Sequence, residues 1–379
     1  LERRLAVRKS TKRTAVVTVG MDLGDQYSQL CVLDGKGEQQ EEARVRTTTA
    51  ALSQRFSEMS RCRVAIEAGT HSPWVSRLLK KCGHEVIVAN PRKVRLIYEN
   101  PAKDDRVDAR YLARVARLDP HLLSPIEHRS EDAQKDLSVL RAREAMVEAR
   151  TKLVNHVRGA VKAIGERVPA MSTETFGTRA SEHIPDALRP ALQPLLAVIQ
   201  ELTKTIRLQD RWIEKIAKER YPQSAVLRTV PGVGGLTSIA YVLTIEDPKR
   251  FPKSRTVGAY LGLTPKRAQS GQDDPQLRIS KAGDPFLRKL LVNCAHYILG
   301  PFGPDSDLRR WGLKLAERGG KNAKKRAIVA VARKLAALLH RLWITQNRYE
   351  PLRHATSKPN ATPAGGLGPP PPARFARLG

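Results

Sequence analysis

Hydrophobic positions in the first 120 residues follow strand-like and helix-like spacing in turn. The apolar run 15–21 and the segment 29–33 flank Gly24 and Asp25, a pattern typical of a β-hairpin. A weaker strand at 43–47 precedes a polar helix. Strand, helix and strand signals then follow at residues 64–66, 74–81 and 86–88. This order predicts antiparallel strands first and βαβ crossovers afterwards, within one mixed α/β domain.

From Glu131 onward the strand signals stop, and apolar residues recur at the three- and four-residue spacing of long helices. The first series is Leu137, Leu140, Val147, Val154, Val157, Val161 and Ile164. The second series is Leu195, Ile199, Leu202, Ile206, Ile213 and Ile216, with Gln209 at the one heptad position that lacks an apolar side chain. Two arrangements fit this spacing, an antiparallel hairpin within the chain and a seam between two copies.

The compositional shifts predict five segments along the 379 residues. They are a basic disordered arm at 1–14, an α/β domain at 15–128, a helical coiled-coil arm at 129–222, a mainly α-helical domain at 223–348 with a loop-rich centre at 264–282, and a disordered tail at 349–379. The tail is rich in Pro, Gly and Ala and cannot bury enough apolar surface to offset its ordering entropy.

The charge balance favours a polyanionic partner, with nucleic acid ahead of an anionic membrane surface. The chain carries 67 Lys and Arg against 38 Asp and Glu, a formal net charge of +29. The longest uncharged stretch, 229–245, is too short for a membrane span and contains Pro231. Cysteines stand only at Cys31, Cys62, Cys82 and Cys294, without the short spacing of a zinc knuckle. We expect a cytoplasmic, nucleoid-associated protein without a membrane partner.

Four acidic residues stand where strands end or a helix begins. Asp22 ends the first apolar strand and Glu67 ends another, in the string VAIEAG. Asp105 and Asp108, in KDDRVDA, are three apart at the start of an expected helix, so both project from one face. Clustered carboxylates suit Mg²⁺ (or Mn²⁺), which prefers hard oxygen ligands. Two such ions can stabilise the attacking and leaving oxygens of a phosphoryl displacement.

Each of these acids also has an ordinary structural role open to it. These roles are a turn at Asp22, a helix cap at Glu67, and ion pairs of Asp105 and Asp108 with Arg106 or Arg110. Asp104 is a second candidate for the third acid, because it stands four residues before Asp108. The ordered set on an RNase H-like pattern of strands and helices favours the catalytic interpretation.

The string LRTVPGVGGLTSIAYVL predicts a helix, a tight hairpin and a second helix. Gly232 and Gly234 permit the tight backbone, and amides at the start of the second helix can bind a phosphate without reading sequence. This element resembles a helix-hairpin-helix DNA-binding motif. A plain turn between helices is the alternative.

Ser270 and Gly271 lie in a polar stretch among cations. These cations are Lys266, Arg267, Arg278, Lys281 and Arg288. A serine among positive charges can attack a phosphodiester, because they stabilise both the alkoxide and the transition state. Ser-Gly pairs are also common in turns, and Ser280 is an alternative that we expect to cap the following helix. A further basic group supplies charge for the nucleic-acid backbone: Lys324, Lys325 and Arg326.

Taken in order, MDLG, IEAG, KDDRVDA, VPGVG, GLTP, QSG and ISKAG resemble the insertion-sequence 110 family of bacterial DEDD transposases, over roughly 16–343. The resemblance implies a RuvC-like domain with metal ligands Asp22, Glu67, Asp105 and Asp108. It also implies a helical arm and a transposase domain whose nucleophile corresponds to Ser270. Asp104 departs from the pattern, since many relatives carry threonine there.

The resemblance further implies a reaction and its partners. Ser270 would form a phosphoserine intermediate with DNA, and an element-encoded bridge RNA would pair with donor and target DNA. A homodimer or homotetramer would assemble a composite site between protomers. Two other functions stay open: a RuvC-like, structure-selective DNA endonuclease such as a junction resolvase, and a non-catalytic nucleic-acid-binding protein whose acids are structural.

Overall fold

The computed structural model describes residues 17–93, 104–275, 277–320 and 322–353. The chain divides after Ser130 into two compact units, which are described separately. The disordered arm predicted at 1–14, and the part of the predicted tail from 354 onward, lie outside the described residues. In the described part, no helix is long and apolar enough to cross a membrane.

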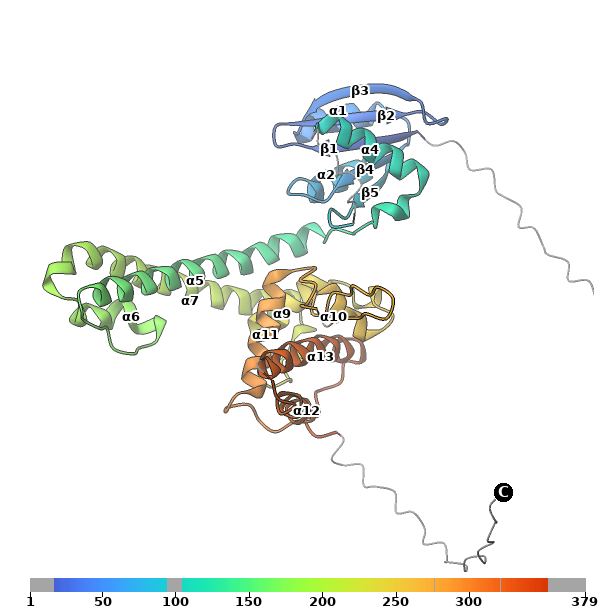
Figure 1. The fold of residues 1–379 in the computed structure, drawn as a ribbon. Coiled ribbons are helices and arrows are strands. Elements are labelled where there is room, and N and C mark those ends of the chain that lie inside the picture. The colour runs from blue at the N-terminus through green and yellow to red at the C-terminus, as the bar shows by residue number, and fades with distance from the viewer. Residues whose placement is uncertain (1–16, 94–103, 276, 321, 354–379) are drawn as a thin grey trace, which may run out of the picture. The chain divides into compact units, whose positions relative to one another are not determined.

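The first unit is built on a five-stranded sheet in the order β3-β2-β1-β4-β5 (Figure 1). The strands are β1 Thr18–Leu23, β2 Tyr27–Leu33, β3 Gln39–Arg46, β4 Arg63–Glu67 and β5 Glu85–Ala89. β1, β2 and β3 pair antiparallel, whereas β4 pairs parallel with β1 and with β5. The predicted order of an antiparallel part followed by crossovers is confirmed, and this mixed sheet is compatible with an RNase H-like domain.

Helices cover both faces of this sheet. They are α1 Thr49–Ser57, α2 Ser72–Lys81 and α4 Asp105–Leu118, followed by the 3₁₀ turn η1 Pro120–Leu123. α1 and α2 bury Phe56 and Leu79 against Met21 and Ile66 on one face. α4 packs on the opposite face, against alternate residues of β1, β2 and β4. The alternation of side chains along each strand therefore sorts them between the two layers.

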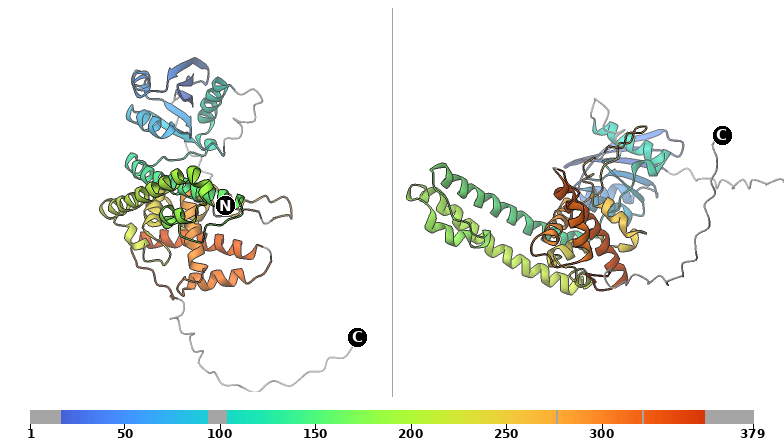
Figure 2. Two further views of the ribbon diagram at one scale, coloured as in Figure 1. Left: turned by 90° about the vertical axis from the view of Figure 1, so that its left-hand side faces the viewer. Right: turned by 60° about the horizontal axis from the view of Figure 1, so that its bottom comes forward.

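The second unit begins with a helical arm (Figure 2). Its elements are α5 Glu131–Ala163, α6 Thr173–Arg179, η2 Ala180–His183, η3 Asp186–Leu188 and α7 Arg189–Arg220. The start of α5 packs with the end of α7, where Leu137 shares a core with Ile213. The end of α5 packs with the start of α7, where Val157 shares a core with Leu196. The two long helices thus form an antiparallel hairpin within the chain.

The rest of the second unit is mainly helical. Its elements are α8 Ser224–Leu227, α9 Gly235–Ile245, η4 Pro248–Arg250, η5 Ser254–Thr256, α10 Val257–Tyr260, α11 Pro285–Leu299, α12 Asp307–Ala316 and α13 Ala323–Thr345. α9 is the central helix, because every residue from Thr237 to Ile245 is buried. α11 and α13 pack around it, and the hydroxyl of Tyr241 donates to the carbonyl of Ala336 at 2.7 Å.

Candidate functional site

Asp22 and Glu67 lie at equivalent places on neighbouring parallel strands. β1 and β4 are in register as far as Met21 and Ile66, and the two acids are the next residue on each strand. Ala65, two residues before Glu67, packs in the core beneath α4. Because side chains alternate along a strand, Glu67 projects from the same face. Both acids are half-buried.

Gly20 shows how closely α4 approaches β1. A Cβ atom on Gly20 would lie 2.0 Å from the carbonyl oxygen of Ala109, so glycine is the residue that this packing allows. At the other end of the contact, Arg63 at the start of β4 donates to the carbonyl of Ala116 near the end of α4. α4 therefore runs against the direction of β1 and β4. Its first turn lies at the end of the sheet where Asp22 projects.

The first turn of α4 carries the other predicted acids. Asp104 is the N-cap, and its carboxylate accepts a hydrogen bond of 3.0 Å from the amide of Arg106. Asp105 and Asp108 occupy the first turn, three residues apart, as predicted. Since the carboxylate of Asp104 already holds the helix end, the structure gives Asp104 a capping role and leaves Asp105 and Asp108 to project from the turn.

Two of the ordinary roles considered for the acids are wrong. Glu67 does not cap the following helix, because α2 has His71 at its N-cap position. Asp22 does not begin a turn but lies inside β1. Arg110 forms an ion pair with Glu42 of β3, and that hydrogen bond raises the pKa of the Arg110 guanidinium.

All four predicted acids thus belong to one end of one sheet face, with donors of the type that Mg²⁺ prefers. In the described ranges, however, no three His, Cys, Asp or Glu side chains lie close enough to hold an ion together. The four acids supply the oxygen donors that a divalent cation prefers, and they stand at the same end of the sheet.

Ser270 lies at the tip of a two-stranded ribbon in the second unit. The ribbon is held by backbone hydrogen bonds of 2.9 Å from Lys266 to Arg278 and from Ser280 to Thr264. The sequence predicted only a loop-rich centre here, and the ribbon was missed. The serine itself is exposed.

The turn at the tip fixes the backbone of Ser270. Its amide donates to the carbonyl of Asp273 at 3.1 Å, and the amide of Asp273 donates back at 3.0 Å. Gly271 has a φ of +57°, a left-handed conformation that glycine adopts without strain. The predicted Ser-Gly turn is therefore present, and it is a tight hairpin turn that presents the serine side chain to solvent.

Arg288 of α11 secures the base of this ribbon. Its guanidinium donates to the carbonyl of Leu261 at 3.0 Å and to that of Ala282 at 2.8 Å. Gly262 has a φ of +68°, and a Cβ atom there would lie 2.3 Å from the amide nitrogen of Ala282. Arg288 was predicted to bind nucleic acid, and the structure shows its guanidinium engaged in holding the ribbon.

Asp284 caps the helix that follows the ribbon. Its Oδ1 accepts hydrogen bonds from the amides of Phe286 at 2.9 Å and Leu287 at 3.1 Å. The prediction that Ser280 caps this helix is wrong. Ser280 lies within the ribbon, four residues before the cap, and its hydroxyl accepts from the amide of Ala282.

The other predicted contact residues are surface cations. Lys266, Arg267, Arg278 and Lys281 are exposed along the ribbon. Arg267 donates to the side chain of Gln269 at 2.6 Å. Lys324, Lys325 and Arg326 are exposed on the first turn of α13. Cations at a helix start oppose the helix dipole, so their binding of nucleic acid stays a prediction that charge alone supports.

The predicted helix, turn and helix around Gly232 are present as α8, a tight turn and α9. Gly232 has a φ of +87°, and Gly234 is the N-cap of α9. The carboxylate of Glu214 lies against the first turn of α9, so closely that a Cβ atom on Gly235 would meet it at 1.9 Å. A phosphate at this helix start would approach that carboxylate, which opposes the predicted anion site.

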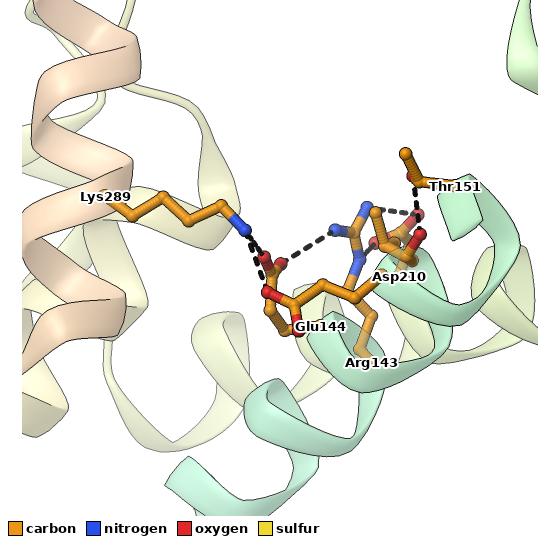
Figure 3. A network of polar contacts seen from close by, with 7 residues as sticks. Arg143, Glu144, Thr151, Asp210 and Lys289 are labelled. Carbon is orange, nitrogen blue, oxygen red and sulfur yellow. Dashed lines mark hydrogen bonds and ion pairs between the residues drawn. The ribbon is translucent and has the colours of Figure 1, made fainter. Parts of the chain in front are cut away.

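A polar network joins the arm to α11 (Figure 3). Lys289 of α11 binds the carboxylates of Glu144 and Glu148 on α5, and these bonds raise the pKa of its ammonium group. Arg143 donates to Asp210 of α7 at 2.8 Å. The start of α11, which follows the serine ribbon, is therefore fixed to the arm by charged contacts.

Two family models match this chain. A DEDD-type IS110 model, described as a transposase, matches residues 19–165, which include the four predicted acids. A second model, described as the transposase IS116/IS110/IS902 family, matches residues 224–306, which include Ser270 and its ribbon. The first match covers most of the first unit and the start of the second, and the second match covers the part of the second unit that follows the arm, as far as Ser306.

Curated relatives match this chain over most of its length. The chain is 26% identical to the transposase of insertion sequence element IS1111A from Coxiella burnetii, over 92% of this chain and 96% of that protein. It is 28% identical to the IS1328 transposase of Yersinia enterocolitica, over 74% of this chain and 83% of that protein. It is 29% identical to a probable family 20 transposase of Pseudomonas aeruginosa, over 88% of this chain and 98% of that protein. The chain therefore belongs to the IS110 family and is a DNA transposase.

Proposed function

We propose that this transposase cuts and rejoins DNA through a covalent phosphoserine intermediate at Ser270. The observation that carries the proposal is the placement of Ser270 at the exposed tip of a ribbon whose turn and base are both held by hydrogen bonds. A nucleophile held in a fixed position can meet a phosphodiester without first ordering its own loop. Ser270 and the cations Lys266 and Arg278 share this ribbon.

The proposed step exchanges one phosphoester bond for another. The Ser270 oxygen bonds to phosphorus and its proton leaves, while one P–O bond of the DNA breaks and the departing DNA oxygen takes up a proton. A DNA hydroxyl reverses the step at the joining stage and releases the serine. Because the number of ester bonds is unchanged, the reaction needs no nucleotide cofactor. The ribbon cations stabilise the charge that builds on the phosphate.

Asp22, Glu67, Asp105 and Asp108 would hold the Mg²⁺ or Mn²⁺ that we propose for this reaction. A divalent ion at such a site supplies positive charge to the phosphate oxygens and to the leaving oxygen. The sheet contributes two of the carboxylates from rigid parallel strands, and α4 contributes two from its first turn. The cap at Asp104 fixes where that turn begins.

The surplus of positive charge supports donor and target DNA as substrates, together with a bridge RNA. A net charge of +29 neutralises nucleic-acid backbone without specifying a sequence, so base pairing with an RNA would select the sites. We propose that a homodimer or homotetramer carries out the reaction, so that two DNA duplexes are cut and exchanged within one assembly.

A covalent-capture assay tests the mechanism. Purified protein, Mg²⁺, candidate RNA and end-labelled element-junction DNA are incubated and separated on a denaturing gel. We expect a protein–DNA adduct with wild type and with the matched control Ser280→Ala, and none with Ser270→Ala or Asp105→Asn. Cleavage that survives in Ser270→Ala without any adduct would replace the proposal with a metal-dependent endonuclease. Full activity in both Ser270→Ala and Asp105→Asn would assign the residues structural roles.

A further inference from the structure

We propose that a hollow on the helical arm binds an unpaired base of single-stranded nucleic acid, stacked on Trp212. The hollow has a volume of about 350 Å³ and opens between the two long helices. Ser138, Val139 and Ala142 of α5 line it, together with Gln209 and Trp212 of α7. The proposal concerns the arm alone and depends on neither Ser270 nor the four acids.

Trp212 presents an unusually open aromatic ring. The residue is 51% exposed, although tryptophan is a side chain that folding normally buries. The ammonium group of Lys215 lies over the ring, 5.6 Å from its centre, so a base would stack on the opposite face. A flat ring beside a cation is the arrangement that single-strand binding proteins use, because bases stack on the ring while the cation meets the backbone. Val139 and Ala142 add an apolar surface beside the ring.

Gln209 has a hydrogen-bond acceptor without a partner among the described residues, which supports ligand binding at the hollow independently of Trp212. It occupies the one heptad position of α7 that lacks an apolar side chain. Its Oε1 atom is shielded from solvent and has no hydrogen-bond partner among the described residues. Gln209 also lines the hollow, and because the terminal torsion of a glutamine is soft, its amide can reorient when a strand binds. An N–H group on the edge of a base would satisfy its acceptor.

The charge around the hollow favours nucleic acid over a second copy of the arm. Lys215 is exposed on the same side of α7 as Trp212, and Arg211 and Lys218 are exposed on the adjoining side of the helix, next to Lys215. Phosphates of a bound strand would neutralise these cations. Two arms meeting face to face through Trp212 would instead bring their cations together, which is unfavourable.

Binding of labelled strands to the full chain, measured without divalent metal, tests the proposal. The probes are fluorescein-labelled 20-nucleotide oligo-U and oligo-dT, with a 20-base-pair duplex for comparison. We expect Trp212→Ala to weaken single-strand binding by about 5- to 150-fold, the range that loss of one stacked base gives, and to leave duplex binding unchanged. Leu208→Ala is the matched control, since Leu208 is 56% exposed one turn away. Tighter binding of oligo-U than of oligo-dT would indicate that the bound strand is RNA, and the reverse order would indicate DNA.

Photocrosslinking locates the contact. A strand carrying 5-iodouracil crosslinks on irradiation to an aromatic ring on which it stacks, and we expect the crosslinked peptide to contain Trp212. Equal affinities for Trp212→Ala and Leu208→Ala, with no crosslink at Trp212, would overturn the proposal. So would a Trp212→Ala variant that sediments as a smaller assembly yet binds strands normally, since the hollow would then hold a second copy. Because no cleavage is measured, these outcomes are independent of the proposed serine chemistry.

Discussion

Arg141 of α5 donates a hydrogen bond of 2.9 Å to Oδ2 of Asp284, whose other oxygen caps α11. The Asp284 side chain is only 4% exposed, so this carboxylate is held by both partners away from water. One buried residue thereby joins the helical arm to the helix that follows the serine ribbon. The link spans 143 residues of sequence.

Asp284→Ala should destabilise the second unit more than loss of a helix cap alone. Removal of a cap costs about 0.5–2 kcal/mol. The pair with Arg141 adds up to about 1 kcal/mol, since the Arg141 side chain is 54% exposed and partly screened. Urea unfolding measures the difference. Ser172→Ala, which removes the cap of α6, is the control, and an equal loss in both variants would show that the Arg141 bond contributes nothing.

Arg288→Ala should loosen the serine ribbon without unfolding the unit. The variant leaves the carbonyls of Leu261 and Ala282 without their donor, at a cost of about 1–3 kcal/mol for the local structure. We expect faster hydrogen exchange at the amide of Ser280 and a reduced yield of the Ser270 adduct. Arg267→Ala, on the exposed part of the ribbon, should leave exchange unchanged. An unchanged hydrogen-exchange rate in Arg288→Ala would mean that the ribbon is stable without the hydrogen bonds from Arg288.

Gly20→Ala should separate α4 from the sheet. The added methyl group would meet the carbonyl of Ala109 at 2.0 Å and the amide of Ala113 at 2.4 Å, both of them backbone atoms that cannot move aside. Overpacking of this kind costs about 1–3 kcal/mol, and α4 carries two of the four acids. Unfolding followed by the ¹⁹F NMR signal of fluorotryptophan at Trp74, which is resolved from those of the three tryptophans in the second unit, reports on the first unit. At Gly69, where nothing lies within 4 Å, the same substitution should have little effect.

Local sequence patterns predicted the elements that carry the acids better than the contacts between those elements. Alternating apolar residues marked β1 and β4, and the string KDDRVDA marked the start of α4. Which end of the sheet α4 approaches depends on the contact between Gly20 and Ala109, and no local pattern contains that information. The shared face of Asp22 and Glu67 follows from strand pairing alone.

The serine ribbon escaped prediction because its apolar pattern is weak. Its first side is polar around Lys266 and Gln269, and its second side alternates only at Leu277 and Ile279, so the Ser-Gly pair gave the clearest signal, and that signal was a turn. The mistaken cap at Ser280 has a similar cause. Both Ser280 and Asp284 are good capping residues, and the backbone hydrogen bond from Ser280 to Thr264 decides between them.

Metal binding should distinguish Asp104 from Asp105. Asp104→Ser keeps a capping side chain, so α4 should still begin at the same residue. If Asp105 is the third ligand, Asp104→Ser keeps the full thermal stabilisation by Mg²⁺ or Mn²⁺, whereas Asp105→Ser loses most of it. Saturation at 100 times Kd corresponds to about 2.7 kcal/mol of stabilisation, which a thermal-shift assay resolves. The reverse pattern would make Asp104 the ligand.

His128 should make the first unit less stable in weak acid. Burial lowers the pKa of the His128 imidazole, and the cations Arg77, Lys80 and Arg129 lower it further, while its Nε2 lies 2.9 Å from the hydroxyl of Ser72. The folded histidine therefore stays neutral where the unfolded one, with a pKa of about 6.5, takes up a proton. The unfolded state binds more protons in this window, so stability present above about pH 6.5 is lost as the pH falls toward the lower folded pKa.

Unfolding midpoints of the first unit in the full chain, followed by the ¹⁹F NMR signal of fluorotryptophan at Trp74 between pH 8 and pH 5, measure this loss. Its slope from one group is at most about 1.4 kcal/mol per pH unit. His128→Gln keeps a hydrogen-bonding group for Ser72 but cannot titrate, so the difference between wild type and variant should shrink as the pH falls. His121→Gln, at an exposed position, is the control for replacing a histidine of the same unit by glutamine. Parallel curves for wild type and His128→Gln would show that His128 takes up its proton equally in both states.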